Sequence, residues 1–235
     1  VLKLIDSADV LIEGYRPGVA ERLGLGPEVL HARNPKLVYA RMTGWGQEGP
    51  LALSAGHDIN YISIAGALDK FGRDAGRPVP PLNLVGDYGG GSMFLVYGIT
   101  CALLQAARTG AGQVVDAAMV DGAATLMAFQ YGFEANNFYK PFSQRGQHLF
   151  GGTHHYYNTY ECADGKFVSV GALEVHFYLE FIEKLGVDKS LFESQWLGSP
   201  EQDLAKMPAL EAILADTFKT KTRDEWAAIF EGSNA

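Results

Sequence analysis

Short apolar runs alternate with helical signals over the first part of the chain. The apolar runs at 9–13 and 37–42 predict two buried strands, and two helices that begin at prolines fall between them. Strands that are separated by helices usually pair in parallel within an α/β sheet. Ligands collect at the carboxyl ends of such strands, so we expect segments 13–16 and 43–46 to lie near a ligand.

The middle and the end of the chain show other patterns. Apolar positions predict helices over 58–68, 92–109 and 122–133, while 113–120 fits either a strand or the start of a helix. Strand-like runs at 156–160 and 167–170 flank a turn and predict a β-hairpin. Helices are then expected at 174–186 and 224–230, the second opened by a capping box at Thr222 and Glu225.

These patterns divide the chain into a larger and a smaller part. We expect residues 1–135 to belong to a large α/β domain, 136–155 to form a linker, and 156–235 to form a small, incomplete α+β domain. The chain opens inside a helical pattern without an initiator methionine and stops just after a helix. The expectation is therefore a fragment that lacks both terminal segments.

Composition narrows the class of protein. The chain has 235 residues, of which 47% are apolar and 20% charged, which is typical of a globular protein. A net charge of −8 argues against general nucleic-acid binding, and the lack of a long unbroken apolar run argues against a membrane span. Two cysteines give no disulfide framework, and His154 and His155 lack a third metal ligand, so no metal site is expected.

His57 and Asp87 are the main candidates for chemistry. His57 follows a glycine and precedes a predicted helix, and Asp87 follows Gly86 before a long helix. A histidine and a carboxylate on opposite sides of one carbon could remove a proton from one face and return it to the other. Each residue also has a structural interpretation, since a lone histidine is often structural and an aspartate before a helix is often its N-cap.

Further candidates are weaker when they are taken singly. Glu174 begins a predicted helix, where an acid is stabilised by the helix dipole, although it could instead orient His57. Arg16, Arg22 and Arg41 could contact phosphate, but each fits an ordinary surface residue. The glycines after Asp87 would let a ligand approach the backbone, and they lack the lysine of a nucleotide-binding phosphate loop.

Taken together, several motifs resemble the family III (CaiB/BaiF-type) CoA-transferase superfamily, and within it the racemase branch that acts on α-methylacyl-CoA. The resemblance runs through essentially the whole chain, with the motifs in family order. The Gly-His-Asp sequence is typical of the racemase branch. The motifs are ADVLIEGYRPG at 8–18, LGLG at 23–26, TGWG at 43–46, GHDINY at 56–61, GDYGGG at 86–91, GQVVD at 112–116 and DGK at 164–166.

The resemblance implies a fold and a site that composition cannot show. The fold would be a Rossmann-like, CoA-binding large domain plus a smaller α+β domain, in an interlocked homodimer with active sites between subunits. His57 and Asp87 would be the acid/base pair, with Glu174 hydrogen-bonded to His57. Residues that would contact CoA or substrate are Arg22, Gly56, Asp58, Ile59, Asn60, Tyr61, Gly89 and Gly90.

The implied reaction is inversion at C2 of a 2-methyl-branched acyl-CoA thioester through an enolate, with CoA as part of the substrate and no separate cofactor. One alternative is a family III CoA-transferase in which Asp87 is the nucleophile. A second is a CoA-thioester binding protein without catalysis. The expected compartment is the cytoplasm in a bacterium, or the peroxisome or mitochondrion in a eukaryote.

Overall fold

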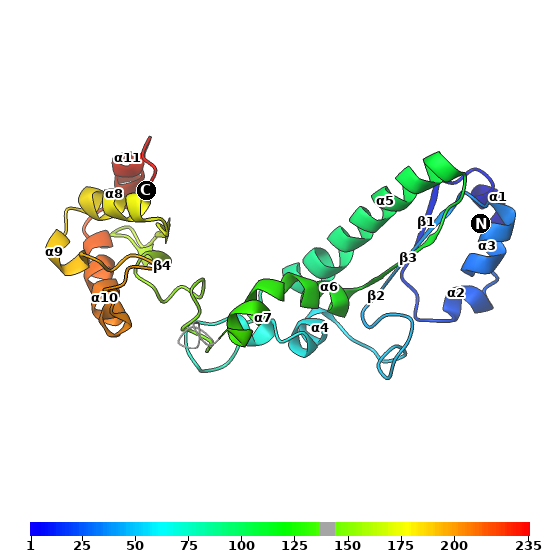
Figure 1. Cartoon of the computed structure of the whole chain (residues 1–235), viewed down its shortest axis with the longest axis horizontal. Helices are drawn as coiled ribbons and strands as arrows, with labels where there is room; N and C mark the ends of the chain where they lie inside the picture. The colour runs from blue at the N-terminus through cyan, green and yellow to red at the C-terminus, as the bar shows by residue number, and fades with distance from the viewer. Residues whose placement is uncertain (137–143) are drawn as a thin grey trace. The chain divides into compact units, whose positions relative to one another are not determined.

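The computed structural model describes residues 1–136 and 144–235 (Figure 1). These residues form two compact units. The first unit contains residues 1–71 and 78–136, and the second contains 72–77 and 144–235. Two segments therefore differ from the expected domain boundaries, since 72–77 and most of the predicted linker belong to the second unit.

A three-stranded parallel sheet is the centre of the first unit. Its strand order is β1 (Val10–Glu13), β2 (Val38–Thr43) and β3 (Val114–Ala118). Parallel pairing of β1 with β2 and of β2 with β3 confirms the predicted α/β class. The segment 113–120, where the sequence fits a strand or a helix start, contains both, because β3 runs directly into a helix.

Helices cover both faces of this sheet. One face carries Tyr39, which packs with Ile5 and Leu30, and the other carries Ala40, which packs with Leu95. The faces alternate because successive side chains of a strand point to opposite sides. The helices that supply these contacts are α1 (Leu2–Ile5), α3 (Pro27–Arg33) and α5 (Met93–Thr109), and the short α2 (Val19–Arg22) follows β1.

A second group of helices packs beside the carboxyl ends of the strands. Ile62 contributes to a buried cluster with Ala123 and Met127. A Cβ atom on Gly122 would lie 1.8 Å from the carbonyl oxygen of Gly90, so two backbones are in direct contact here. The elements are α4 (Asp58–Ile64), the 3₁₀ turn η1 (Leu68–Lys70), the π-helical η2 (Leu84–Ser92), α6 (Met119–Leu126) and α7 (Ala128–Ala135).

The second unit contains the predicted hairpin and a cluster of helices. Strands β4 (Tyr157–Glu161) and β5 (Phe167–Gly171) pair antiparallel, which confirms the hairpin. Its core is aromatic, with Tyr156, Tyr178 and Trp226 almost completely buried. The helices are α8 (Val175–Leu185), α9 (Lys189–Phe192), η4 (Leu204–Lys206), α10 (Met207–Phe218) and α11 (Arg223–Phe230).

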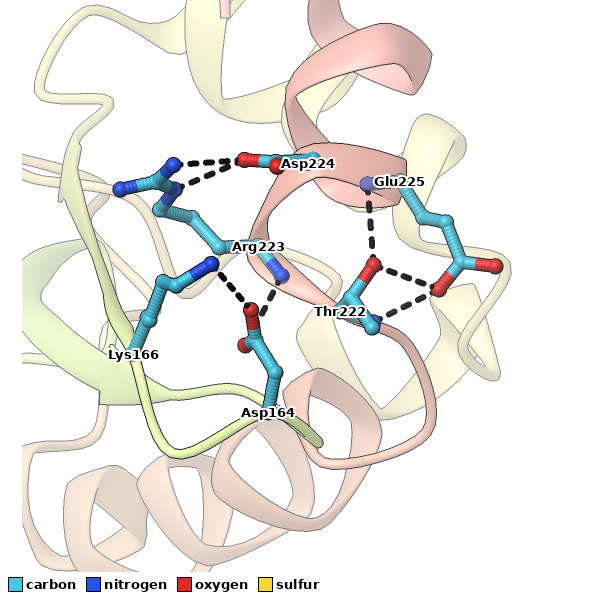
Figure 2. Close-up of polar contacts among 6 residues, drawn as sticks. All are labelled: Asp164, Lys166, Thr222, Arg223, Asp224 and Glu225. Atoms are coloured by element: carbon cyan, nitrogen blue, oxygen red, sulfur yellow. Dashed lines mark hydrogen bonds and ion pairs between the residues drawn. The ribbon is translucent and has the colours of Figure 1, made fainter.

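The start of α11 is fixed by the predicted capping box (Figure 2). The Glu225 N–H donates to Thr222 Oγ1 at 3.3 Å, and the Thr222 N–H donates to Glu225 Oε2 at 2.8 Å. The hairpin turn is attached to the same helix start, because the Arg223 N–H donates to Asp164 Oδ1 at 3.2 Å and Lys166 pairs with Asp164 at 3.1 Å. Capping thus joins the helix to the hairpin.

Arginine contacts explain why segment 72–77 belongs to the second unit. Arg73 donates to Asn158 Oδ1 at 3.0 Å and to the hydroxyl of Thr159, both on β4. Arg145 donates to backbone carbonyls of the segment, including those of Asp74 and Ala75 at 3.0 Å each. Sequence patterns predict a loop here but do not show which part of the chain holds it.

One helical stretch within the described residues, 84–109, is long and apolar enough to cross a membrane, judged by length and composition alone. Core helices of globular proteins often share these two properties. Its Leu95 and Ala102 are buried, whereas Met93, Val96 and Tyr97 are exposed on the chain as described.

Because His155 is buried, we expect the second unit to lose stability as the pH falls. The Nε2 of His155 lies 2.8 Å from the hydroxyl of Tyr178, and its Nδ1 lies 3.2 Å from Met207 Sδ, so both ring nitrogens have buried polar neighbours. Burial lowers the pKa of His155 to about 3 and that of His154 to about 4. Because a histidine in the unfolded chain has a pKa of about 6.5, the unfolded state takes up protons first as the pH falls.

This difference in proton binding sets the direction in which the unfolding free energy changes with pH. Stability from the neutral histidines is complete above about pH 6.5 and is lost as the pH falls toward the folded pKa, by up to about 1.4 kcal/mol per pH unit for each histidine. His155→Gln, which can still hydrogen-bond to Tyr178 but does not titrate, should reduce this slope. Denaturant unfolding at pH 7.5, 6.5 and 5.5 measures it, and equal slopes in both proteins would contradict the prediction.

Candidate functional site

A cavity of about 350 Å³ lies at the carboxyl ends of β1 and β2. This position agrees with the rule for ligands of parallel sheets, and both predicted segments contribute to it. His57 is part of the lining, whereas Asp87 is not. The lining consists of Gly14, Tyr15, Arg16, Pro17, Met42, Thr43, Gly44, Trp45, Ala52, Ser54, Ala55, Gly56, His57, Tyr61 and Met119.

His57 is exposed and stands at the N-cap position of α4 with an extended backbone. Its N–H donates to Asn60 Oδ1 at 3.0 Å, which is one half of a capping box. Asn60 thus has a structural task in fixing how the chain enters the helix, and Ile59 beside it is 43% exposed. Their predicted contacts with CoA or substrate stay predictions.

Tyr61 explains two glycines at the cavity. The tyrosine is 6% exposed and its ring meets Trp45 edge to face at a centroid distance of 4.8 Å. A Cβ on Gly44 would lie 2.2 Å from this ring, and one on Gly56 would lie 2.6 Å from it. Burial, and then the charges of Asp87 and Asp58, raise the pKa of Tyr61, so its hydroxyl stays protonated at neutral pH.

Asp58 connects the His57 segment to the Asp87 segment. Its side chain is buried at 5% exposure, and Oδ2 accepts the N–H groups of Gly86 at 2.6 Å and Asp87 at 2.8 Å. The residue next to His57 is therefore hydrogen-bonded to the backbone of Asp87. The two predicted catalytic segments, which the sequence could not show to be close, meet in the first unit.

Asp87 lies inside the π-helical η2 rather than at the N-cap of the long helix. The N-cap expectation was wrong because helical structure begins at Leu84, three residues before Asp87. The side chain is half-buried, and Asn83 Nδ2 donates to Asp87 Oδ2 at 3.3 Å. π-Helical turns are rare and occur frequently at functional sites.

The glycines after Asp87 allow helices to pack closely. A Cβ on Gly90 would lie 2.5 Å from the backbone nitrogen of Ala123 in α6, and one on Gly89 would lie 3.0 Å from Leu126. Packing therefore accounts for Gly90, which is buried, without any ligand. The predicted substrate contacts of Gly89 and Gly90 are not needed to explain these residues and stay predictions.

Arg41 is the buried centre of an ionic network. It is 7% exposed, and it donates to Glu13 Oε1 at 3.0 Å and to Glu21 Oε1 at 2.9 Å. Glu13 in turn accepts the Tyr15 N–H at 2.7 Å. The hydrogen bond from Arg41 is the main reason that the pKa of Glu21 is lowered. The surface interpretation of Arg41 was wrong, and its carboxylate partners account for the residue without a phosphate.

The ionic network around Arg41 positions the part of the cavity lining that follows β1, and the sequence did not reveal this role. Glu13 holds the loop after β1, and Glu21 holds α2, which ends at the exposed Arg22. The available signal was a charged residue, Arg41, inside an otherwise apolar strand, because a buried charge needs partners. Arg16 and Arg22 remain exposed and are still candidates for phosphate contacts.

Glu174 belongs to the second unit. It is exposed and occupies the N-cap position of α8, and its carbonyl accepts the Tyr178 N–H at 2.9 Å. Its predicted hydrogen bond to His57 stays a prediction. Within residues 1–136 and 144–235, no group of three histidine, cysteine, aspartate or glutamate side chains could hold a metal ion.

The parallel sheet, the cavity at its strand ends and the joined motifs define an α/β protein with a candidate ligand site. The chain belongs to CoA-transferase family III, since the model of that family matches residues 1–235. It is 43% identical to alpha-methylacyl-CoA racemase of Mus musculus over 97% of the chain, and 41% identical to that of Homo sapiens over 99%. It spans 58% and 59% of these two relatives.

A solved structure supports the fold. The crystal structure of Rv3272 from Mycobacterium tuberculosis matches with a TM-score of 0.75 at 30% identity, covering 98% of this chain and 59% of that one. The family III fold expectation is therefore confirmed.

The buried network predicts a large difference between two arginines. Arg41→Met would leave Glu13 charged and buried without its partner, which should lower the unfolding free energy by about 3–5 kcal/mol. Arg33→Met breaks the exposed pair with Asp6 and should cost no more than about 1 kcal/mol. Urea unfolding measures both, and similar losses for the two variants would contradict the assigned roles.

Proposed function

We propose that this chain carries the acid/base residues of a racemase that inverts C2 of 2-methyl-branched acyl-CoA thioesters. The observation that carries the proposal is the hydrogen-bonded junction of the His57 and Asp87 segments beside the strand-end cavity. Identity of 43% and 41% to two named racemases supports it. Relatives named as CoA-transferases match at lower identity or over a shorter part of the chain.

The proposed reaction is a proton transfer across one carbon. A neutral imidazole nitrogen of His57 removes the proton at C2, and the C–H electron pair forms the C1–C2 double bond of an enolate. The protonated carboxyl of Asp87 then gives its proton to the opposite face, and the thioester carbonyl reforms. The reverse direction exchanges the two roles, and positioned acid/base groups contribute about 10²–10⁴-fold each.

Two arginines, a glutamate and a second subunit complete the proposed site. Arg16 and Arg22 would bind the phosphates of CoA, since guanidinium groups match phosphate geometry, and CoA is part of the substrate rather than a separate cofactor. Glu174 would orient His57 by a hydrogen bond. We propose that the active protein is a homodimer. Each site would be formed by the first unit of one subunit and the second unit of the other.

Replacing His57 tests the acid/base assignment. In the full-length protein, His57→Ala should lower deuterium incorporation at C2 in heavy water by at least about 10²-fold, because the proton acceptor is lost. Binding of the acyl-CoA thioester should stay within a few-fold of wild type. Proton NMR with a single enantiomer of a 2-methylacyl-CoA measures the exchange, and calorimetry measures the binding.

A matched control is His31→Ala, because His31 lies on α3 and its ring contacts the Leu37 carbonyl outside the cavity lining. That variant should exchange at nearly the wild-type rate. Wild-type exchange by His57→Ala would remove the racemase assignment. Movement of CoA to an added free acid, without exchange at C2, would instead favour a transferase with Asp87 as nucleophile.

A further inference from the structure

Asp58 is a buried carboxylate whose hydrogen bonding is incomplete. Its carboxylate is buried at 5% exposure, yet its two hydrogen bonds are both to backbone N–H groups of η2. The second oxygen, Oδ1, is buried and has no hydrogen-bond partner among the described residues. A buried carboxylate with an unsatisfied oxygen costs free energy, and such costs persist mainly where function requires them.

The position of these bonds shows what they control. Asp58 is the first residue of α4 and follows His57 directly, while its acceptor oxygen holds the N–H of Asp87 itself at 2.8 Å. One side chain therefore ties the backbone beside the imidazole to the backbone that carries the carboxyl. The hydrogen bonds are charge-assisted and short, and both fix the same turn of the π-helix.

Gly86 is shaped to admit this side chain. A Cβ atom on Gly86 would lie 2.7 Å from Asp58 Oδ2 and 3.0 Å from its Cγ. The glycine at position 86 is thus required by the carboxylate, independently of any ligand. Asp58 and Gly86 form one contact that can be broken from either side.

We propose that the side chain of Asp58 is a positioning group that sets the separation of His57 and Asp87. This inference rests on the proposed racemase function. Proton transfer between opposite faces of one carbon needs both groups in fixed places, and misplacement by about 1 Å can cost about 10²-fold in rate. Loss of the clamp should therefore lower kcat and leave KM nearly unchanged.

Three variants of the full-length protein test the clamp. Asp58→Ala removes both acceptor bonds and should lower kcat for C2 exchange by about 10²-fold, with KM within about threefold of wild type. Asp58→Asn keeps an acceptor oxygen without the charge and should restore a large part of that loss. Gly86→Ala should displace the carboxylate and reproduce the Asp58→Ala defect, and the double variant should be no worse than either one.

Controls separate the clamp from general destabilisation. Asp9→Ala removes an exposed carboxylate just before β1 and should leave kcat unchanged. Hydrogen–deuterium exchange of the peptide covering 84–92 should show faster exchange in Asp58→Ala at a temperature where the protein stays folded. Rates are expressed per folded molecule, so a purely structural role would lower thermal stability but not kcat.

The outcomes distinguish the clamp from the function on which it rests. Wild-type kcat in folded Asp58→Ala overturns the clamp while leaving the racemase proposal intact. A raised KM with unchanged kcat overturns it too, because that result assigns Asp58 to substrate binding. A wild-type protein without C2 exchange overturns both proposals, and the peptide exchange then still shows whether the two N–H contacts exist.

Discussion

The hydrogen bonds from η2 to the Asp58 carboxylate are the contact on which the site depends. They join two helical segments of the connection between β2 and β3, α4 and η2, at positions 28 to 29 residues apart. They add a direct link between two segments that otherwise meet through their packing against α6. Burying a charge costs free energy. The hydrogen bonds to it are directional, however, because the N–H groups of Gly86 and Asp87 must both point at one oxygen.

Close backbone packing surrounds these hydrogen bonds. Gly90 and Gly122 bring η2 against α6, and Gly44 and Gly56 make room for the Tyr61 ring, which lines the cavity. On the other side of the cavity, Arg41 fixes the loop after β1 by way of Glu13. One wall is therefore held by close packing at glycines, and the other by an ionic network centred on the buried Arg41.

The sequence predicted those features that depend on local pattern. The strands around Val10 and Val38, the hairpin and the capping box at Thr222 were all predicted, because periodicity and capping act over a few residues. Helix α10 was missed although Pro208 in its first turn was a usable signal. The partners of Arg41 and Asp58 could not be predicted, since each contact joins positions that only the fold brings together.

The hydrogen bonds to Asp58 can be compared with what each candidate reaction requires. A transferase of the kind considered needs one nucleophile, so Asp87 alone would have to be well placed, and the position of His57 would matter little. Racemisation needs two groups on opposite faces of the same carbon, which makes their mutual placement part of the barrier. A buried carboxylate that ties the segment of one group to the segment of the other places Asp87 in both cases, but only racemisation also uses the link to His57. The contact at Asp58 therefore supplies the mutual placement that the proposed inversion requires, and it would also hold a nucleophilic Asp87 in place.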